Sequence, residues 1–286
     1  MKKNKKALYL ILFCGFLLRI WGINFGLPFQ FHQDEPIVVN HALAYGTGDF
    51  NPHFFAIPPL TSYLLFFIYA VYFLLGKLMG IFRTTEAFAI AFFKDPSVFY
   101  LLGRLSIGVI AGILSILFTY KLYKIIFSQN KGALFAASLV AFNCLNVANS
   151  HYIYTDMLLS LFIIITTLQL VKTYNLTRLK NYILSGIFIG LAIGTKYNAA
   201  ILIVPFLITH LFICRNQKTG LFSINIIMGA ISLFLTLFIT NPFMFLDFKF
   251  FINSFAAQAG ASGYVGWLHH INYSLRESIG LLFFIL

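Results

Sequence analysis

The chain has 286 residues, of which 60% are hydrophobic and only 10% are charged, whereas about a quarter of the residues in a soluble domain are charged. Apolar runs of about 20 residues, the length that a membrane-spanning helix needs, recur along the chain, so the composition excludes an independently folding soluble domain. The 20 basic against 8 acidic residues do not indicate nucleic-acid binding, because the basic residues stand at the ends of apolar runs and not in one stripe.

The first apolar run follows a lysine-rich start and extends from Ala7 to about Leu27. No small-x-small cleavage site follows it, so we expect a retained first span and not a signal peptide. A last apolar run begins near Ser278 and is nine residues long when the chain stops. That is too short for a bilayer of about 30 Å, which predicts that the sequence is a fragment. Further spans are expected at about 58–81, 98–120, 132–149, 157–171, 182–195, 197–214 and 222–241.

The positive-inside rule predicts the path of the chain around 58–81. If this run crosses the membrane, three later basic clusters lie opposite the basic N-terminus, contrary to the rule. If it dips into or lies on the outer surface, these clusters join the N-terminus in the cytoplasm, and all acidic residues lie outside. We predict the second arrangement, with outer loops at 27–97, 150–156 and 242–277, although 58–81 is long enough to span. The clusters are Lys121/Lys124/Lys131, Lys172/Arg178/Lys180 and Arg215/Lys218.

The first outer loop carries two adjacent carboxylates, Asp34 and Glu35. Asp34 is expected at the N-cap of a short interfacial helix, with Pro36 in the first turn and Gly46 as the stop. A capping carboxylate without further role is the alternative. Two neighbouring acids between aromatic, apolar stretches favour a functional role.

Later polar residues are expected on the same face of the membrane. Asp156 precedes the 157–171 run, and Lys196 interrupts two apolar helices, with a snorkelling lysine as its alternative. Arg19 and Arg104 lie in the outer halves of their spans, where an arginine requires a carboxylate, a phosphate or a polar cavity. A polar strip on the 132–149 run is either an interhelical hydrogen-bond seam or a substrate wall. Its members are Asn143, Asn146 and Asn149.

Carboxylates and cations at one membrane boundary suit a substrate with an apolar tail and an anionic phosphate, as in a lipid-linked sugar. Cationic side chains would hold the phosphate leaving group, and a carboxylate would act as general base on an acceptor hydroxyl. The rival function is a transporter or flippase of lipid-linked sugars, but transporters place charges near the bilayer centre and show inverted repeats. A purely structural subunit is the third alternative.

Four segments in order along the chain resemble the lipid-carrier-dependent glycosyltransferases related to protein O-mannosyltransferases and to the aminoarabinose transferase of lipid A. The segments are HQDEP at 32–36 with GDFNPHFF at 48–55, PPL at 58–60, 150–156, and 190–197. The resemblance implies an all-α, polytopic membrane protein with the C-class glycosyltransferase fold, here as one domain over 1–286. It also implies inverting transfer from a polyprenyl-phosphate sugar at the outer face.

The resemblance implies site residues as well. Asp34 matches the catalytic base. We expect Glu35, as a second catalytic carboxylate, and Asp156 to position the acceptor or to shape the sugar pocket. Aminoarabinose transferases have a lysine before the paired prolines, where this chain has Ala56-Ile57, so we expect Lys196 to contact the donor phosphate. Arg104 is expected to help neutralise that phosphate. The expected substrate-binding residues are Asp49, His53, Arg104, His151, Asp156, Lys196 and Tyr197.

No cofactor is expected to be required. His32, Asp34 and His53 with Glu35 could bind a divalent cation, but His-x-Asp without a third fixed ligand is weak evidence, and the three cysteines lack metal-binding spacing. His269-His270 is expected at the interface or against substrate phosphate. The expected partners are membrane lipid, the polyprenyl-phosphate-linked donor and a glycan, lipid or protein acceptor, without nucleic acid. The expected location is the plasma membrane, with several passes, a cytoplasmic N-terminus and a site facing outside.

Overall fold

The structure, a computed structural model, describes residues 2–29, 32–218 and 220–261. Every regular element in these ranges is a helix, which confirms the predicted all-α fold. The elements are α1 (Lys2–Ile20), α2 (Glu35–Ala44), η1 (Tyr45–Thr47), α3 (Leu60–Leu78), α4 (Thr85–Lys94), α5 (Ser97–Gly103), η2 (Arg104–Val109), α6 (Ile110–Phe127), α7 (Asn130–Phe142), α8 (Cys144–Asn149), α9 (Thr155–Asn175), α10 (Leu179–Thr195), η3 (Tyr197–Leu202), α11 (Ile203–Gln217), α12 (Ile224–Thr240), α13 (Phe243–Leu246) and α14 (Phe248–Ala261).

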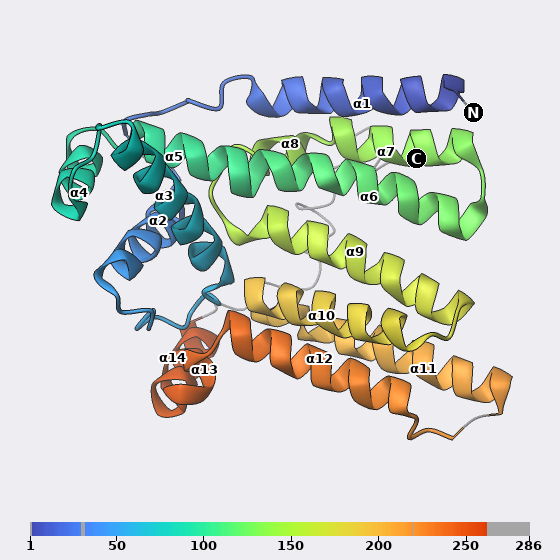
Figure 1. Ribbon diagram of the computed structural model, residues 1–286. Coiled ribbons are helices and arrows are strands. Elements are labelled where there is room, and N and C mark those ends of the chain that lie inside the picture. Colours follow the sequence, from blue (N-terminus) through green and yellow to red (C-terminus); the bar gives the residue numbers. More distant parts are fainter. Residues whose placement is uncertain (1, 30–31, 219, 262–286) are drawn as a thin grey trace.

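The long helices form a bundle whose two ends differ in charge (Figure 1). The N-terminus of α1 and the turns after α6, α9 and α11 lie at one end, which we call the basic end because the predicted basic clusters gather there. The opposite end holds α2, α3, α4, α13 and α14 and the start of α9. We call it the acidic end, since the aspartates and glutamates of the described ranges belong to these elements and their flanking turns.

The path of the chain around 58–81 agrees with the predicted grouping of charges. α3 is long and apolar enough to cross a membrane. However, it lies at the acidic end, where α1 ends and α5 begins, and it makes a steep angle with α6 (Figure 1). The chain therefore does not pass to the basic end between α1 and α6. Three further stretches have the length and composition of spans, and they are Ser97–Phe127, Thr155–Asn175 and Tyr197–Gln217.

Close packing of α10 against α12 depends on glycines spaced four residues apart, which lie on one helix face. A Cβ at Gly186 would stand 2.1 Å from the carbonyl oxygen of Gly229, and one at Gly190 would stand 2.7 Å from Thr236. Small residues at this spacing let helix backbones approach closely in membranes. This contact fixes the end of α10, and hence Lys196, against the rest of the bundle.

The interfacial helix α2 begins where the sequence predicts it, with Asp34 at its N-cap and Pro36 in its first turn. The α-helix ends at Ala44, two residues before the predicted end near Gly46. The helix continues as the 3-10 turn η1, and the chain reverses at Gly48, whose φ of 93° lies in the left-handed region that glycine tolerates. Gly46 has no such backbone requirement and belongs to η1.

Candidate active site

Three of the predicted site residues lie around the Tyr154 side chain at the acidic end. Lys196 Nζ donates a hydrogen bond to Asp156 Oδ1 at 2.8 Å and lies 5.7 Å from the centre of the Tyr154 ring. Burial, together with the negative charges of Asp34 and Asp156, raises the pKa of Tyr154 to about 12. The site therefore joins the start of α2, the start of α9 and the break after α10.

Asp34 presents a carboxylate that is not engaged by the rest of the described chain. Its side chain makes no capping hydrogen bond, and the described residues offer it no other hydrogen bond or ion pair. Its backbone N–H donates to His32 Nδ1 at 3.3 Å. Asp34 is half-buried. The capping alternative is therefore not the arrangement found, and the carboxylate is available to accept a proton or a hydrogen bond.

An aromatic wall stands next to Asp34. The His32 ring lies 4.2 Å from the ring centre of Tyr152 and 6.1 Å from that of Tyr154, and Phe25 meets Tyr152 edge-on at 5.9 Å. Aromatic faces of this kind pack against apolar surfaces and leave polar tips free. The wall is suited to contact a sugar ring.

Glu35 and Arg104 form a fully buried ion pair behind this wall. Arg104 Nε and Nη2 donate to the two Glu35 oxygens at 2.9 and 2.8 Å, and the Ile153 N–H donates to Glu35 Oε1 at 3.0 Å. Arg104 Nη1 donates to the carbonyls of Ile23 and Phe25. Both residues have 0% exposure. Neither reaches a surface here, so the roles predicted for them in catalysis and phosphate binding stay predictions, and the geometry supports a positioning role.

Arg104 begins η2, a short π-helical segment within the α5–α6 helix. Such segments occur frequently at functional sites, because the widened turn redirects a side chain. The cation–π contact between Arg104 and Phe25, at 5.3 Å, extends the pair towards the aromatic wall.

The second buried arginine, Arg19, stabilises a break in the helix that follows α6. Asn143 interrupts the helix and caps α8 by accepting from the Asn146 N–H at 2.8 Å. Arg19 donates to the carbonyls of Val140 and Ala141 at the end of α7 and to Asn146 Oδ1. A positive charge at a helix C-terminus satisfies its free carbonyls and its dipole. The asparagine strip thus forms an interhelical contact at Asn146, whereas the hydrogen bond from the Asn146 N–H to Asn143 is a local helix cap.

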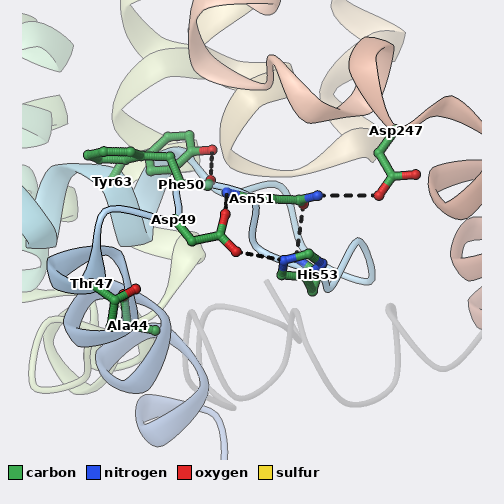
Figure 2. A network of polar contacts seen from close by, with 8 residues as sticks. All are labelled: Ala44, Thr47, Asp49, Phe50, Asn51, His53, Tyr63 and Asp247. Atoms are coloured by element: carbon green, nitrogen blue, oxygen red, sulfur yellow. Dashed lines mark hydrogen bonds and ion pairs between the residues drawn. The ribbon is translucent and has the colours of Figure 1, made fainter.

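Asp49 and His53 belong to a separate, exposed polar cluster (Figure 2). His53 Nε2 lies 2.9 Å from Asp49 Oδ2, and hydrogen bonding to His53 holds the pKa of Asp49 below its usual value. Asn51 Nδ2 donates to Asp247 Oδ2 at 3.3 Å, which connects the first outer loop to the α13–α14 segment (Figure 2). Within the described ranges, no hydrogen bond or ion pair joins this cluster to Asp34 or Lys196.

The last two predicted residues, His151 and Tyr197, make contacts that connect neighbouring elements. His151 lies between the carbonyls of Val147 and Trp21, at 2.9 Å from each, and so holds the second outer loop against the end of α1. The Tyr197 ring packs on Phe251 and Phe255 of α14. Its hydroxyl is buried without a hydrogen-bond partner in the described part of the chain.

The residues considered for a metal are not grouped. His53 pairs with Asp49 and Glu35 pairs with Arg104, and no three His, Cys, Asp or Glu side chains in the described ranges are placed to hold an ion. His269-His270 and residues 262–277 of the loop expected at 242–277 lie outside the described residues, while α13 and α14 occupy most of 243–261.

A cavity of about 1000 Å³ lies elsewhere at the acidic end, between the end of α2, α3 and α4. Its lining is mainly apolar and aromatic and includes Phe66, Phe88 and Phe92. None of the residues predicted for the site lines it. The cavity is therefore a separate feature from the cluster around Tyr154.

Comparison with known proteins identifies the family. The family described as dolichyl-phosphate-mannose-protein mannosyltransferase matches residues 99–243, just over half of the chain. The chain belongs to this family. The predicted relationship to protein O-mannosyltransferases is thereby confirmed, and the matched region contains Arg104, Tyr154, Asp156 and Lys196.

A solved structure shares the fold of this mannosyltransferase-family chain. It is the S. cerevisiae protein O-mannosyltransferase Pmt1-Pmt2 complex bound to the sugar donor, with 19% sequence identity and a TM-score of 0.53. The match covers 94% of this chain and 35% of the yeast chain, so the present sequence spans about a third of that relative. Comparison with curated proteins gave no match. The structural similarity to the yeast complex confirms the predicted C-class glycosyltransferase fold.

Proposed function

We propose that this family member transfers a sugar from a polyprenyl-phosphate-linked donor to an acceptor hydroxyl at the outer membrane face. The observation that carries the proposal is the carboxylate of Asp34, which no described residue engages, next to Tyr154 and the Asp156–Lys196 pair. Membership of the mannosyltransferase family supports a lipid-linked donor. The described apolar helices support a multi-pass membrane protein.

In this mechanism Asp34 is the general base. It takes the proton of the acceptor hydroxyl as that oxygen attacks the anomeric carbon of the sugar. The bond between the anomeric carbon and the phosphate oxygen breaks, and its electron pair leaves with the polyprenyl phosphate. Attack from the face opposite the leaving group inverts the configuration. Asp34 is half-buried and has no competing side-chain partner among the described residues, which suits a base that must accept a proton during the reaction.

Lys196 is the proposed contact for the departing phosphate. An ammonium group has three donors, and in the described structure Lys196 uses one of them, towards Asp156. The remaining donors can bind phosphate oxygens and offset the negative charge that develops as the bond breaks. Asp156 orients the lysine from the opposite side. No step of this mechanism requires a metal ion or another cofactor.

The test follows lipid-phosphate release by the protein in membranes, with a panel of polyprenyl-phosphate sugars and nucleotide sugars. Asp34→Asn should reduce release at least 100-fold, the lower range for loss of a general base, without loss of folded protein. Asp95→Asn is the matched control, because Asp95 is an exposed acid at the same end. Wild-type turnover by Asp34→Asn would refute the role of Asp34. Labelled lipid that moves to the opposite leaflet without phosphate release would instead support the flippase alternative.

A further inference from the structure

Tyr154 is not among the residues predicted from the sequence, yet it touches all three elements of the site. It directly precedes α9, with an extended backbone at φ −145° and ψ 174°. Its ring lies 6.1 Å from the His32 ring on the α2 side and 5.7 Å from Lys196 Nζ on the α10 side. The residue is half-buried, so its ring is held by the protein while part of it remains accessible.

The Asp156–Lys196 pair alone does not fix the lysine. Its side chains are 42% and 37% exposed, and an ion pair in contact with water gains little from its Coulomb attraction. Lysine has a flexible four-carbon stem and a compact charge that binds without strong directional preference. An aromatic face beside the ammonium adds a second attraction that restricts where the charge can lie.

We propose that Tyr154 is a positioning residue that holds the Lys196 ammonium between Asp156 and the donor phosphate. The inference rests on the proposed function, because it takes the phosphate of a lipid-linked sugar as the second anion. In this arrangement Asp156 accepts one hydrogen bond from the ammonium, the Tyr154 ring covers one side of it, and the free donors point to the phosphate. Lys196 thus contacts the donor phosphate while it keeps its hydrogen bond to Asp156.

The ring, and not the hydroxyl, carries this role. The contacts of Tyr154 with Lys196 and His32 are ring contacts. Phenylalanine keeps the aromatic face, whereas leucine removes it at a similar size. Tyr154→Phe should therefore keep the KM for the donor within about twofold of wild type, while Tyr154→Leu should raise it roughly three- to tenfold, the range that a partly exposed cation–π contact allows.

The experiment measures donor KM and kcat for both variants, for Lys196→Ala and for the Tyr154→Leu/Lys196→Ala double variant. If Tyr154 acts through Lys196, the leucine substitution adds no further rise in donor KM once the lysine is gone. Tyr174→Leu is the control, since Tyr174 lies on the same helix at the basic end. An unchanged donor KM in Tyr154→Leu, equal damage by phenylalanine and leucine, or additive effects in the double variant would each overturn the proposal.

A binding measurement separates this inference from the proposed function. Polyprenyl phosphate is titrated against the purified wild-type protein and the Tyr154 variants, without sugar transfer. A Kd raised three- to tenfold by leucine and kept by phenylalanine supports the positioning role, even if the wild type transfers no sugar and the proposed function fails. Absence of wild-type binding overturns the inference, and normal transfer with an unchanged Kd in Tyr154→Leu does so as well.

Discussion

Replacing Glu35 by glutamine distinguishes a positioning role from a catalytic one. Glu35 accepts two hydrogen bonds from Arg104 and one from the Ile153 N–H, and neither side chain of the ion pair is exposed. Glutamine keeps the size of the side chain and one acceptor oxygen. It also leaves the Arg104 charge buried without a counter-charge.

The expected cost follows from that stranded charge. Removing one partner of a buried ion pair destabilises a protein by about 3–5 kcal/mol. Because the remaining amide oxygen still accepts one hydrogen bond, we expect the lower end, about 3 kcal/mol. With a Tm shift of about 2–4 °C per kcal/mol for larger chains, Tm should fall by about 6–12 °C.

The assay is thermal unfolding of the purified protein in detergent, combined with transfer activity measured well below the Tm. Glu86→Gln is the matched control, because Glu86 is an exposed glutamate at the start of α4. Adding Arg104→Met to Glu35→Gln removes both charges and should restore part of the lost stability. An unchanged Tm in Glu35→Gln, together with loss of transfer, would refute this reasoning and support direct action of Glu35 on the substrate.

Two further predictions concern the bundle and the aromatic group of the site. Gly186→Ala should destabilise the protein by about 1–3 kcal/mol or more, because the new Cβ would meet the backbone oxygen of Gly229 at 2.1 Å. In the control variant Gly46→Ala the new Cβ has no atom within 4 Å, so the thermal unfolding curve should hardly change. Equal stability of the two variants would contradict the packing argument. The pKa of Tyr154 is raised to about 12 in the folded protein, so the unfolded chain loses this proton first and stability falls as pH rises from about 10 to about 12. Tyr154→Phe should make that fall smaller when Tm is measured from pH 9 to 12. Equal slopes of Tm against pH in the variant and the wild type would contradict a raised pKa of Tyr154.

The spans and the grouping of charge could be predicted because they depend on local composition. Apolar runs of membrane-spanning length and basic residues at their ends indicate helices and orientation without knowledge of packing. The break at Asn143 could not be predicted in this way, because it depends on Arg19 reaching the end of α7 from a helix more than a hundred residues away in sequence. The exact point of chain reversal after α2 could not be predicted either, for a local reason. Either Gly46 or Gly48 could end the helix locally, and the 3-10 turn η1 decides between them.

The site was predictable in its residue types but not in their pairing. Asp156 and Lys196 each stand next to an apolar run, so their shared end of the bundle followed from the sequence, whereas their hydrogen bond did not. Tyr154 was missed because an aromatic residue before a span is also typical of a membrane-interface anchor. Its alternation with Tyr152 and Asp156 in the second outer loop is the signal that could have indicated a wall beside the carboxylate.

The two adjacent acids of the first loop illustrate how one short segment can supply both an anchor and a base. Successive residues at the start of a helix point about 100° apart, so Asp34 and Glu35 face different surroundings although they are neighbours. Glu35 turns inwards to Arg104 and the Ile153 N–H, and this contact fixes α2 against η2 and the second outer loop. Asp34 then faces Tyr154 with its carboxylate unengaged within the described chain. The buried pair thus determines where the free carboxylate stands, which is why loss of Glu35 should reduce transfer through the position of Asp34 and not through loss of a second base.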